Sequence, residues 1–110
     1  MFHSQLPSVD AAAVPAEAIV LDVREQDEWA AGHADGAVHI PMGEVVSRIG
    51  EVPEGGRVHV VCRVGGRSAQ VAQYLIAQGV DAVNVNGGML DWEAAGRPVV
   101  DGSGGEGFVL

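Results

Sequence analysis

The sequence has no lysine, and this absence excludes several kinds of chemistry. It cannot supply the lysine of a Walker-type phosphate loop, a Schiff-base lysine or a pyridoxal anchor. The chain has six arginines and fifteen acidic residues, so its formal net charge is −9 at pH 7. A surface with this balance repels phosphate backbones and anionic lipids. We therefore expect no nucleic-acid partner, no membrane partner and no cofactor.

Aromatic residues are also scarce, at 5% of the chain, while hydrophobic residues make up 47%. The core must therefore come mostly from Val, Ile, Leu and Ala, which suits layered α/β packing. A chain of 110 residues has the usual size of one domain. We assign this domain to residues 1–100 and predict that the glycine-rich residues 101–110 form a flexible tail.

Long apolar segments are absent as well. No run is long enough to span a bilayer, and Met1–Pro7 has neither a cationic nor an apolar leader region. The sequence therefore predicts a cytoplasmic protein. Because it also lacks a long apolar seam, a monomer is the simplest expectation.

Short apolar runs alternate with segments of helical spacing. Strands are expected at 18–21, 37–40, 57–61 and 82–85. Helices are expected at 25–31, at 42–49, from Ser68 as N-cap to just before Gly79, and at 89–95. This alternation predicts a mainly parallel central sheet flanked by helices, with functional loops at the carboxyl ends of the strands.

A single cysteine, Cys62, ends the predicted strand 57–61 and cannot form an internal disulfide. The segment after it, Arg63-Val64-Gly65-Gly66-Arg67-Ser68, runs into a helix, so backbone amides and the positive helix end converge near the sulfur. The two nearby arginines also favour a thiolate. Gly65 and Gly66 can adopt positive φ angles, so the loop can curl around an anion. The alternative is an inert structural cysteine beside a turn.

Several motifs agree in order and spacing with those of one known family. They are Val20-Leu21-Asp22-Val23-Arg24, Glu28-Trp29, Gly32-His33, Gly36-Ala37 through Ile40-Pro41, the loop Cys62 to Ser68, and the closing set Gly87-Gly88-Met89, Trp92, Gly96 and Pro98. On these residues the chain resembles the rhodanese-type sulfurtransferases over residues 1–100. The resemblance implies a three-layer rhodanese-like α/β fold.

The resemblance also gives meaning to the length of the loop. Arg67 is five positions after Cys62, which is similar to the sulfurtransferase loop, whereas phosphatase-like relatives carry one more residue and a wider pocket. This count favours sulfur transfer over phosphate-ester hydrolysis or arsenate reduction. An arsenate reductase would also need an external thiol here, because the chain has no second cysteine.

The reaction that the resemblance implies is a double displacement with Cys62 as nucleophile. The thiolate attacks the sulfane sulfur of a small anionic donor such as thiosulfate, and a thiol, a thioredoxin-like protein or cyanide removes the outer sulfur from the resulting persulfide. The predicted substrate-binding residues are Arg63, Val64, Gly65, Gly66 and Arg67. Their amides would hold the persulfide anion, and the two arginines would attract the donor.

Not every polar residue near the loop is expected to bind substrate. Arg63 is the more exposed arginine, whereas Arg67 can instead point to its own helix or pair with an acidic residue. The predicted supporting residues are Asp22, Arg24 and Ser68. Asp22 and Arg24 would support the site through charge-assisted hydrogen bonds, with an ion pair to Glu28 as the alternative.

The histidines His33, His39 and His59 show no metal-ligand spacing, so no metal site is predicted. His33 is expected to order a turn, and His59 to face solvent from a strand. Both tryptophans, Trp29 and Trp92, are expected in the core.

Two other functions stay open. The same fold could serve a non-catalytic binding or regulatory domain in which Cys62 acts as a redox sensor. A phosphatase or an arsenate reductase is the less favoured alternative because of the short loop.

Overall fold

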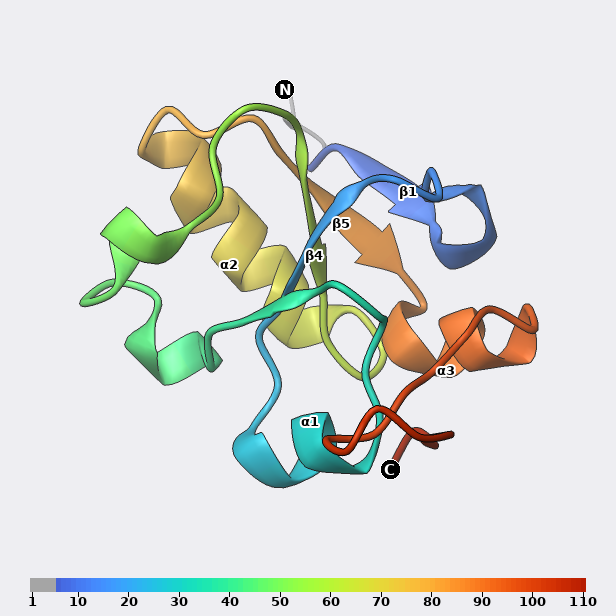
Figure 1. Ribbon diagram of the computed structural model, residues 1–110. Coiled ribbons are helices and arrows are strands. Elements are labelled where there is room, and N and C mark those ends of the chain that lie inside the picture. The colour runs from blue at the N-terminus through green and yellow to red at the C-terminus, as the bar shows by residue number, and fades with distance from the viewer. Residues whose placement is uncertain (1–5) are drawn as a thin grey trace.

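The computed structural model describes residues 6–110 and contains a five-stranded parallel sheet (Figure 1). Its strands are β1 (Ser8–Asp10), β2 (Ile19–Asp22), β3 (Val38–His39), β4 (Val58–Val61) and β5 (Ala82–Asn86). They lie in the order β1-β5-β4-β2-β3, and all four pairings are parallel. β4 is therefore the central strand, with β5 and β2 as its neighbours.

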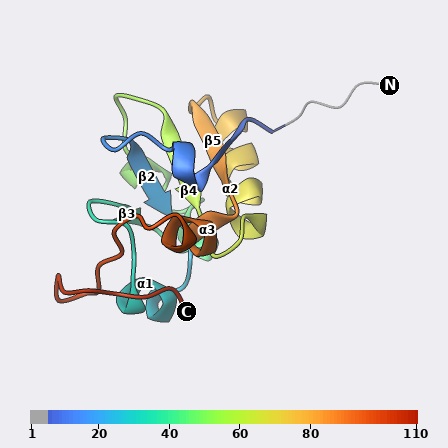
Figure 2. The ribbon, with the colours of Figure 1, turned by 90° about the vertical axis from the view of Figure 1, so that its right-hand side faces the viewer.

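Residues 6–110 also form three α-helices and three short 3-10 helices, of which all but α3 lie between strands in the chain. They are α1 (Gln26–Ala31), α2 (Gly66–Ala77), α3 (Gly88–Ala94), η1 (Ala11–Ala13), η2 (Met42–Glu44) and η3 (Ile49–Glu51). Figures 1 and 2 show α2 and α3 on different sides of the sheet and α1 beyond the carboxyl ends of the strands.

The core forms on both faces of the sheet as two buried clusters. The cluster beneath α2 includes Val58, Val60, Val71, Ala72 and Leu75. The cluster beneath α3 includes Val61, Val85, Met89 and Trp92. Successive side chains of a strand point to opposite faces, so β4 contributes to both clusters. Burying each large aliphatic side chain contributes about 1.5–3 kcal/mol. The predicted three-layer α/β class is confirmed.

The four predicted strands are confirmed to within about two residues at each end. The helices predicted at 25–31 and 89–95 are confirmed as α1 and α3. β1 was not predicted, because its three residues carry no apolar run and become a strand only by pairing with β5 at the sheet edge.

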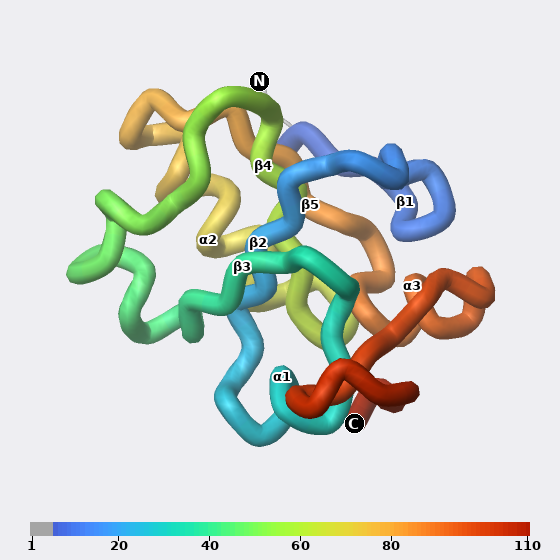
Figure 3. Tube along the Cα trace, in the orientation of Figure 1, coloured from blue at the N-terminus to red at the C-terminus, as the bar shows by residue number. Residues whose placement is uncertain are grey.

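The predicted helix at 42–49 is wrong. This region holds η2 and η3 with a turn between them, within an irregular segment that Figure 3 traces between β3 and β4. Val45 N donates to Met42 O, and Val52 N donates to Ile49 O, which is the i to i+3 pattern of 3-10 turns. Gly43 disfavours a continuous helix by about 1 kcal/mol relative to alanine.

Ser68 is not the helix N-cap that the sequence predicted. α2 begins at Gly66, and the residue before it, Gly65, has a left-handed backbone with φ of 114°. Glycine adopts this conformation without a Cβ clash. Ser68 therefore lies in the first turn of α2, where it is fully buried.

Backbone hydrogen bonds join the glycine-rich segment 101–110, for which the sequence predicted a flexible tail, to other parts of the chain. Val100, just before it, exchanges both backbone hydrogen bonds with His33, and Phe108 N donates to Ala31 O at 3.0 Å. These bonds join segments that are distant in the sequence, so composition alone does not reveal them.

No helix within residues 6–110 is long and apolar enough to cross a membrane. The expectation about a leader at Met1–Pro7 falls mostly on residues 1–5, which lie outside the described residues.

Candidate active site

Cys62 follows the central strand β4 directly, and a short loop then leads into α2. Because β2 and β5 flank β4, Cys62 lies in the middle of the carboxyl edge of the sheet, where parallel α/β sheets usually bind ligands. The cysteine is unpaired and 1% exposed. Cys62 therefore lies at the carboxyl end of a strand, as the sequence predicted, and its role as nucleophile stays a prediction.

Two hydrogen-bond donors approach the Cys62 sulfur. The Gly65 N–H nitrogen lies 3.1 Å from Sγ, and the Ser68 hydroxyl oxygen lies 3.3 Å from it. Burial acts to raise the pKa of the Cys62 thiol, but hydrogen bonds from the Ser68 side chain and from the amides of Ser68, Gly65 and Val64 outweigh burial. The net effect lowers this pKa below its usual value, which favours the thiolate.

Asn84 on β5 is a member of the site that the sequence did not suggest. Its Oδ1 lies 2.6 Å from the Ser68 hydroxyl oxygen, and its Nδ2 donates to Gly65 O at 3.3 Å. A hydroxyl has one proton, so Ser68 donates either to Asn84 or to the sulfur at any moment. The only sequence signal was a polar residue inside the apolar strand 82–85, at a position that proves buried.

The loop is also held from the side of α3. Met89 N donates to Cys62 O at 2.8 Å, and Leu90 N donates to Arg63 O at 3.1 Å. A Cβ on Gly88 would collide with Cys62 O and would lie 2.7 Å from the Arg63 carbonyl carbon. The sequence singled out this glycine as part of a turn, whereas the structure shows that its missing side chain lets α3 touch the active loop.

Asp22 and Arg24 form a fully buried ion pair at the end of β2. Arg24 Nη2 lies 2.7 Å from an Asp22 carboxylate oxygen and also donates to Gly32 O at 2.7 Å. The alternative pairing with Glu28 is wrong, because Glu28 binds a different arginine. Among the described residues, Arg24 Nη1 has no hydrogen-bond partner. The hydrogen bonds of this pair join β2 to the end of α1 and do not reach the sulfur.

Arg67 pairs with Glu28 of α1 through two hydrogen bonds, at 2.7 and 2.9 Å. The hydrogen bond from Arg67 lowers the pKa of Glu28 to about 2, and the carboxylate in turn raises the pKa of Arg67. This outcome matches the alternative in which Arg67 binds an acidic residue. The pair ties α1 to the first turn of α2. Within residues 6–110, no acidic side chain forms an ion pair with Arg63, the other arginine of the loop.

Arg63 and Val64 are the exposed side chains of the loop, and Val64 is 55% exposed. Arg63 Nε donates to the backbone oxygen of Leu110 at 2.8 Å. Gly66 is exposed as well, whereas Gly65 is buried. The predicted substrate-binding residues therefore lie together at the amino end of α2, where one is buried, one is half-buried and three are exposed.

The rings of His33 and His39 stack with the ring of Trp29. The Trp29 ring lies 3.6 Å from His33 and 4.7 Å from His39, centroid to centroid. His33 Nδ1 lies 2.7 Å from Trp29 O, which confirms its role in ordering a turn. Trp29 is only half-buried, so its predicted core position is wrong, while Trp92 is confirmed as a core residue.

His59 is buried rather than solvent-facing, and its Nδ1 lies 3.2 Å from Ile19 O of the neighbouring strand. Within residues 6–110, no group of three or more His, Cys, Asp or Glu side chains is arranged to hold a metal ion.

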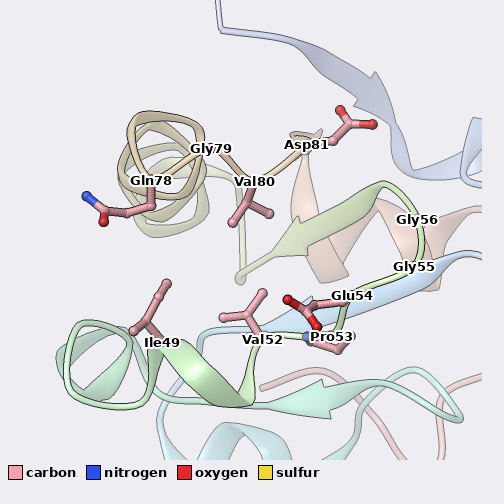
Figure 4. Close-up of a pocket in the computed structure, with 10 residues that line it drawn as sticks. All are labelled: Ile49, Val52, Pro53, Glu54, Gly55, Gly56, Gln78, Gly79, Val80 and Asp81. Carbon is pink, nitrogen blue, oxygen red and sulfur yellow. The ribbon is translucent and has the colours of Figure 1, made fainter.

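The cavity drawn in Figure 4 does not include Cys62 among its lining residues. Its volume is about 360 Å³, and it is lined by residues of η3, the turn 53–56 and the segment 78–81. These segments precede β4 and β5 in the chain, so the cavity lies at the amino ends of the strands. Its lining holds no cysteine, histidine or arginine, and we assign no catalysis to it.

Comparison with known proteins agrees with this geometry. A family model of the rhodanese-like domain matches residues 8–95. The chain is 40% identical over 82 residues to YtwF of Bacillus subtilis, which covers 74% of this chain and 80% of YtwF. It is 35% identical over 85 residues to a sulfurtransferase of Allochromatium vinosum, which covers 76% of this chain and 79% of that protein.

Solved structures of related sequences share the fold. A rhodanese-related protein of Thermoplasma volcanium is 32% identical with a TM-score of 0.80, covering 86% of this chain and 97% of its own. A thiosulfate sulfurtransferase of Pseudomonas aeruginosa is 28% identical with a TM-score of 0.78, covering 96% of this chain and 22% of its own. The sheet order, the loop after β4 and these matches lead to one conclusion: the chain belongs to the rhodanese-like domain family.

Proposed function

We propose that this protein is a sulfurtransferase that carries one sulfur atom at a time as a persulfide on Cys62. The observation that carries the proposal is the set of hydrogen bonds from Gly65 and Ser68 to the sulfur, which lower the thiol pKa and so favour the nucleophilic thiolate. The sulfurtransferases among the relatives support sulfur transfer in general.

The proposed reaction has two half-reactions. In the first, the Cys62 thiolate attacks the sulfane sulfur of the donor, and a new S–S bond forms at Sγ. The S–S bond of the donor breaks, and its electron pair leaves on sulfite when thiosulfate is the donor. In the second, an acceptor thiolate or cyanide attacks the outer sulfur, the persulfide bond breaks, and its electron pair returns to Sγ. The cysteine ends as the thiolate with which it began.

The short loop supports sulfur transfer over phosphate chemistry. The chain enters α2 within four residues of Cys62, and the Gly65 amide lies within hydrogen-bond distance of the sulfur. Because this short loop is similar to the sulfurtransferase loop, which holds one bulky sulfur, it favours sulfur transfer over phosphate-ester hydrolysis. We also propose that the protein works in a reducing compartment such as the cytoplasm, which keeps the thiol available. We propose that it acts there as a monomer.

A non-catalytic or redox-sensing role is the second candidate. Cys62 is 1% exposed, so access to the sulfur is narrow. One relative, the HTH-type transcriptional regulator Rv0324 of Mycobacterium tuberculosis, is 33% identical over 89 residues that cover 79% of this chain and 39% of that protein. Turnover separates the two roles, because a sensor reacts once whereas a sulfurtransferase returns to its thiolate in every cycle.

Incubating the reduced protein with thiosulfate should add the mass of one sulfur atom, and subsequent cyanide should remove it. The expectation follows from the stabilised thiolate of the single cysteine. Intact mass spectrometry of the protein and of its Cys62→Ser variant measures the change. Sulfur uptake by the Cys62→Ser variant, or no uptake by the reduced parent, would disprove the persulfide mechanism.

Arg63→Ala should raise the KM for thiosulfate by about tenfold and change kcat much less. The loss of one exposed cation removes an interaction with the dianionic donor before and during the reaction, and such charge-assisted contacts contribute about 1.5–3 kcal/mol when fully made. The matched control is Arg57→Ala, whose exposed guanidinium binds Asp81 away from the loop. If both variants keep the KM of the parent, Arg63 does not bind the donor.

A further inference from the structure

The last four residues, 107–110, cross from α1 to the active loop, and we call them the strap. Phe108 N donates to Ala31 O at 3.0 Å, and Val109 N donates to a Glu93 carboxylate oxygen at 3.0 Å. The backbone oxygen of Leu110 then accepts the hydrogen bond from Arg63 Nε at 2.8 Å. Figures 1 and 2 both show this end of the chain running beside α1. The strap thus joins α1, α3 and the loop that holds Cys62.

The close fit of the strap depends on two glycines. A Cβ on Gly32 at the end of α1 would collide with Phe108 O and lie 2.6 Å from Phe108 N. A Cβ on Gly107 would lie 2.8 Å from Ala31 O and from the carbonyl carbon of Val100. Upstream, Val100 pairs with both His33 and Glu106. The strap therefore packs closely against the backbone of neighbouring segments. It lies beyond residue 95, where the match to the family model ends.

The far end of the strap is less firmly held than its start. Phe108 is 57% exposed and Leu110 is 44% exposed, so only Val109 packs against the core cluster beneath α3. The final hydrogen bond goes to an exposed arginine and is open to competition from solvent and anions. The hydrogen bond between Leu110 and Arg63 can consequently break without unfolding the sheet.

We propose that the strap is an autoinhibitory element that competes with the anionic donor for Arg63; this rests on the function proposed above. While Leu110 accepts from Nε, the guanidinium is held toward the strap and one of its five N–H groups is in use. The oxyanion of a donor needs the same side chain turned to the loop. Anionic donors therefore load Cys62 well only after the end of the strap has moved away.

Two variants remove the strap contact in different ways. Deletion of residues 107–110 removes the strap, and Gly107→Val keeps the chain length but makes a Cβ that collides with Ala31 O. Ser103→Ala is the matched control, since its side chain bonds only to Asp101 within the preceding turn. Circular dichroism and thermal unfolding test whether each variant is folded. If the deletion variant does not fold, Gly107→Val alone tests the proposal.

The deciding measurement is the alkylation rate of Cys62 by anionic iodoacetate divided by its rate with neutral iodoacetamide. This ratio needs no sulfur transfer. Both strap variants should raise it about tenfold, because they free one cation near the sulfur, and Ser103→Ala should not. In an Arg63→Ala background the strap variants should have no effect on the ratio. An unchanged ratio in the strap variants, a gain that persists without Arg63, or no reaction of either reagent in any variant would overturn the proposal.

A parallel measurement of the KM for thiosulfate separates the two proposals. If the strap variants lower this KM about tenfold, the strap and the donor compete at Arg63. If the alkylation ratio rises but no variant forms a persulfide with thiosulfate, the strap controls access of anions while the proposed sulfur transfer fails.

Discussion

Gly88→Ala should slow persulfide formation by on the order of 100-fold, because a displacement of about 1 Å at an active site costs that much. Gly88 opens α3 with φ of 53°, and a Cβ there would overlap Cys62 O and approach the Arg63 carbonyl carbon to 2.7 Å. These obstacles are backbone atoms, so they yield only if the whole loop moves. Such a shift takes the Gly65 amide away from the sulfur and returns the thiol pKa toward its ordinary value.

The control for this variant is Gly96→Ala at the other end of α3. Gly96 also has a positive φ, 76°, but a Cβ there would find nothing within 4 Å. It therefore isolates the cost of a left-handed backbone, which is roughly 1–2 kcal/mol for alanine. Intact mass spectrometry at timed intervals with thiosulfate measures the rate, and circular dichroism checks the fold. If Gly88→Ala is as fast as Gly96→Ala, contact between α3 and the loop does not set the geometry of the site.

Asp22→Ala should lower the free energy of unfolding by about 3–5 kcal/mol, because it leaves a buried guanidinium without its counter-ion. Asp22 and Arg24 are both fully buried, and the carboxylate accepts from Arg24 Nε and Nη2. The loss is a large part of the roughly 5–15 kcal/mol that stabilises an ordinary domain. Urea unfolding followed by circular dichroism measures the change.

Two controls test whether burial of the charge is the cause. The double variant Asp22→Val with Arg24→Met replaces both charges by apolar groups and should be more stable than Asp22→Ala. Arg57→Met breaks an ion pair whose side chains are 56% and 64% exposed, so it should cost no more than about 1 kcal/mol. Equal losses for Asp22→Ala and Arg57→Met would mean that burial of this pair adds nothing to stability.

Much of the site could be predicted because its central part is local in sequence. Strand 57–61, Cys62, the two glycines after it and the helix that follows are neighbours in the chain, and each leaves its own pattern. The positive φ of Gly65 follows from the same stretch. The helix expected at 42–49 failed because its apolar spacing fits two 3-10 turns as well as one helix.

The partners of the polar side chains could not be predicted in the same way. Arg67 and Glu28 are 39 positions apart, and Ser68 and Asn84 are 16 apart. Which acid an arginine binds depends on the distance between helices in the folded chain, and the strand order sets that distance. For the same reason the sequence predicted only a turn at Gly88, whereas in the structure this glycine allows close contact with the backbone of another segment.

The sequence by itself determined the α/β class, the single cysteine at the end of a strand and the glycine turn that brings amides to the sulfur, because periodicity and backbone freedom are properties of neighbouring residues. Only the tertiary structure decided that Arg67 is tied to Glu28, that Arg24 is buried against Asp22, and that the strap reaches Arg63 across 47 positions of sequence. These contacts depend on how the parallel strands stack and which segments the sheet brings to one edge, and no local pattern encodes that arrangement.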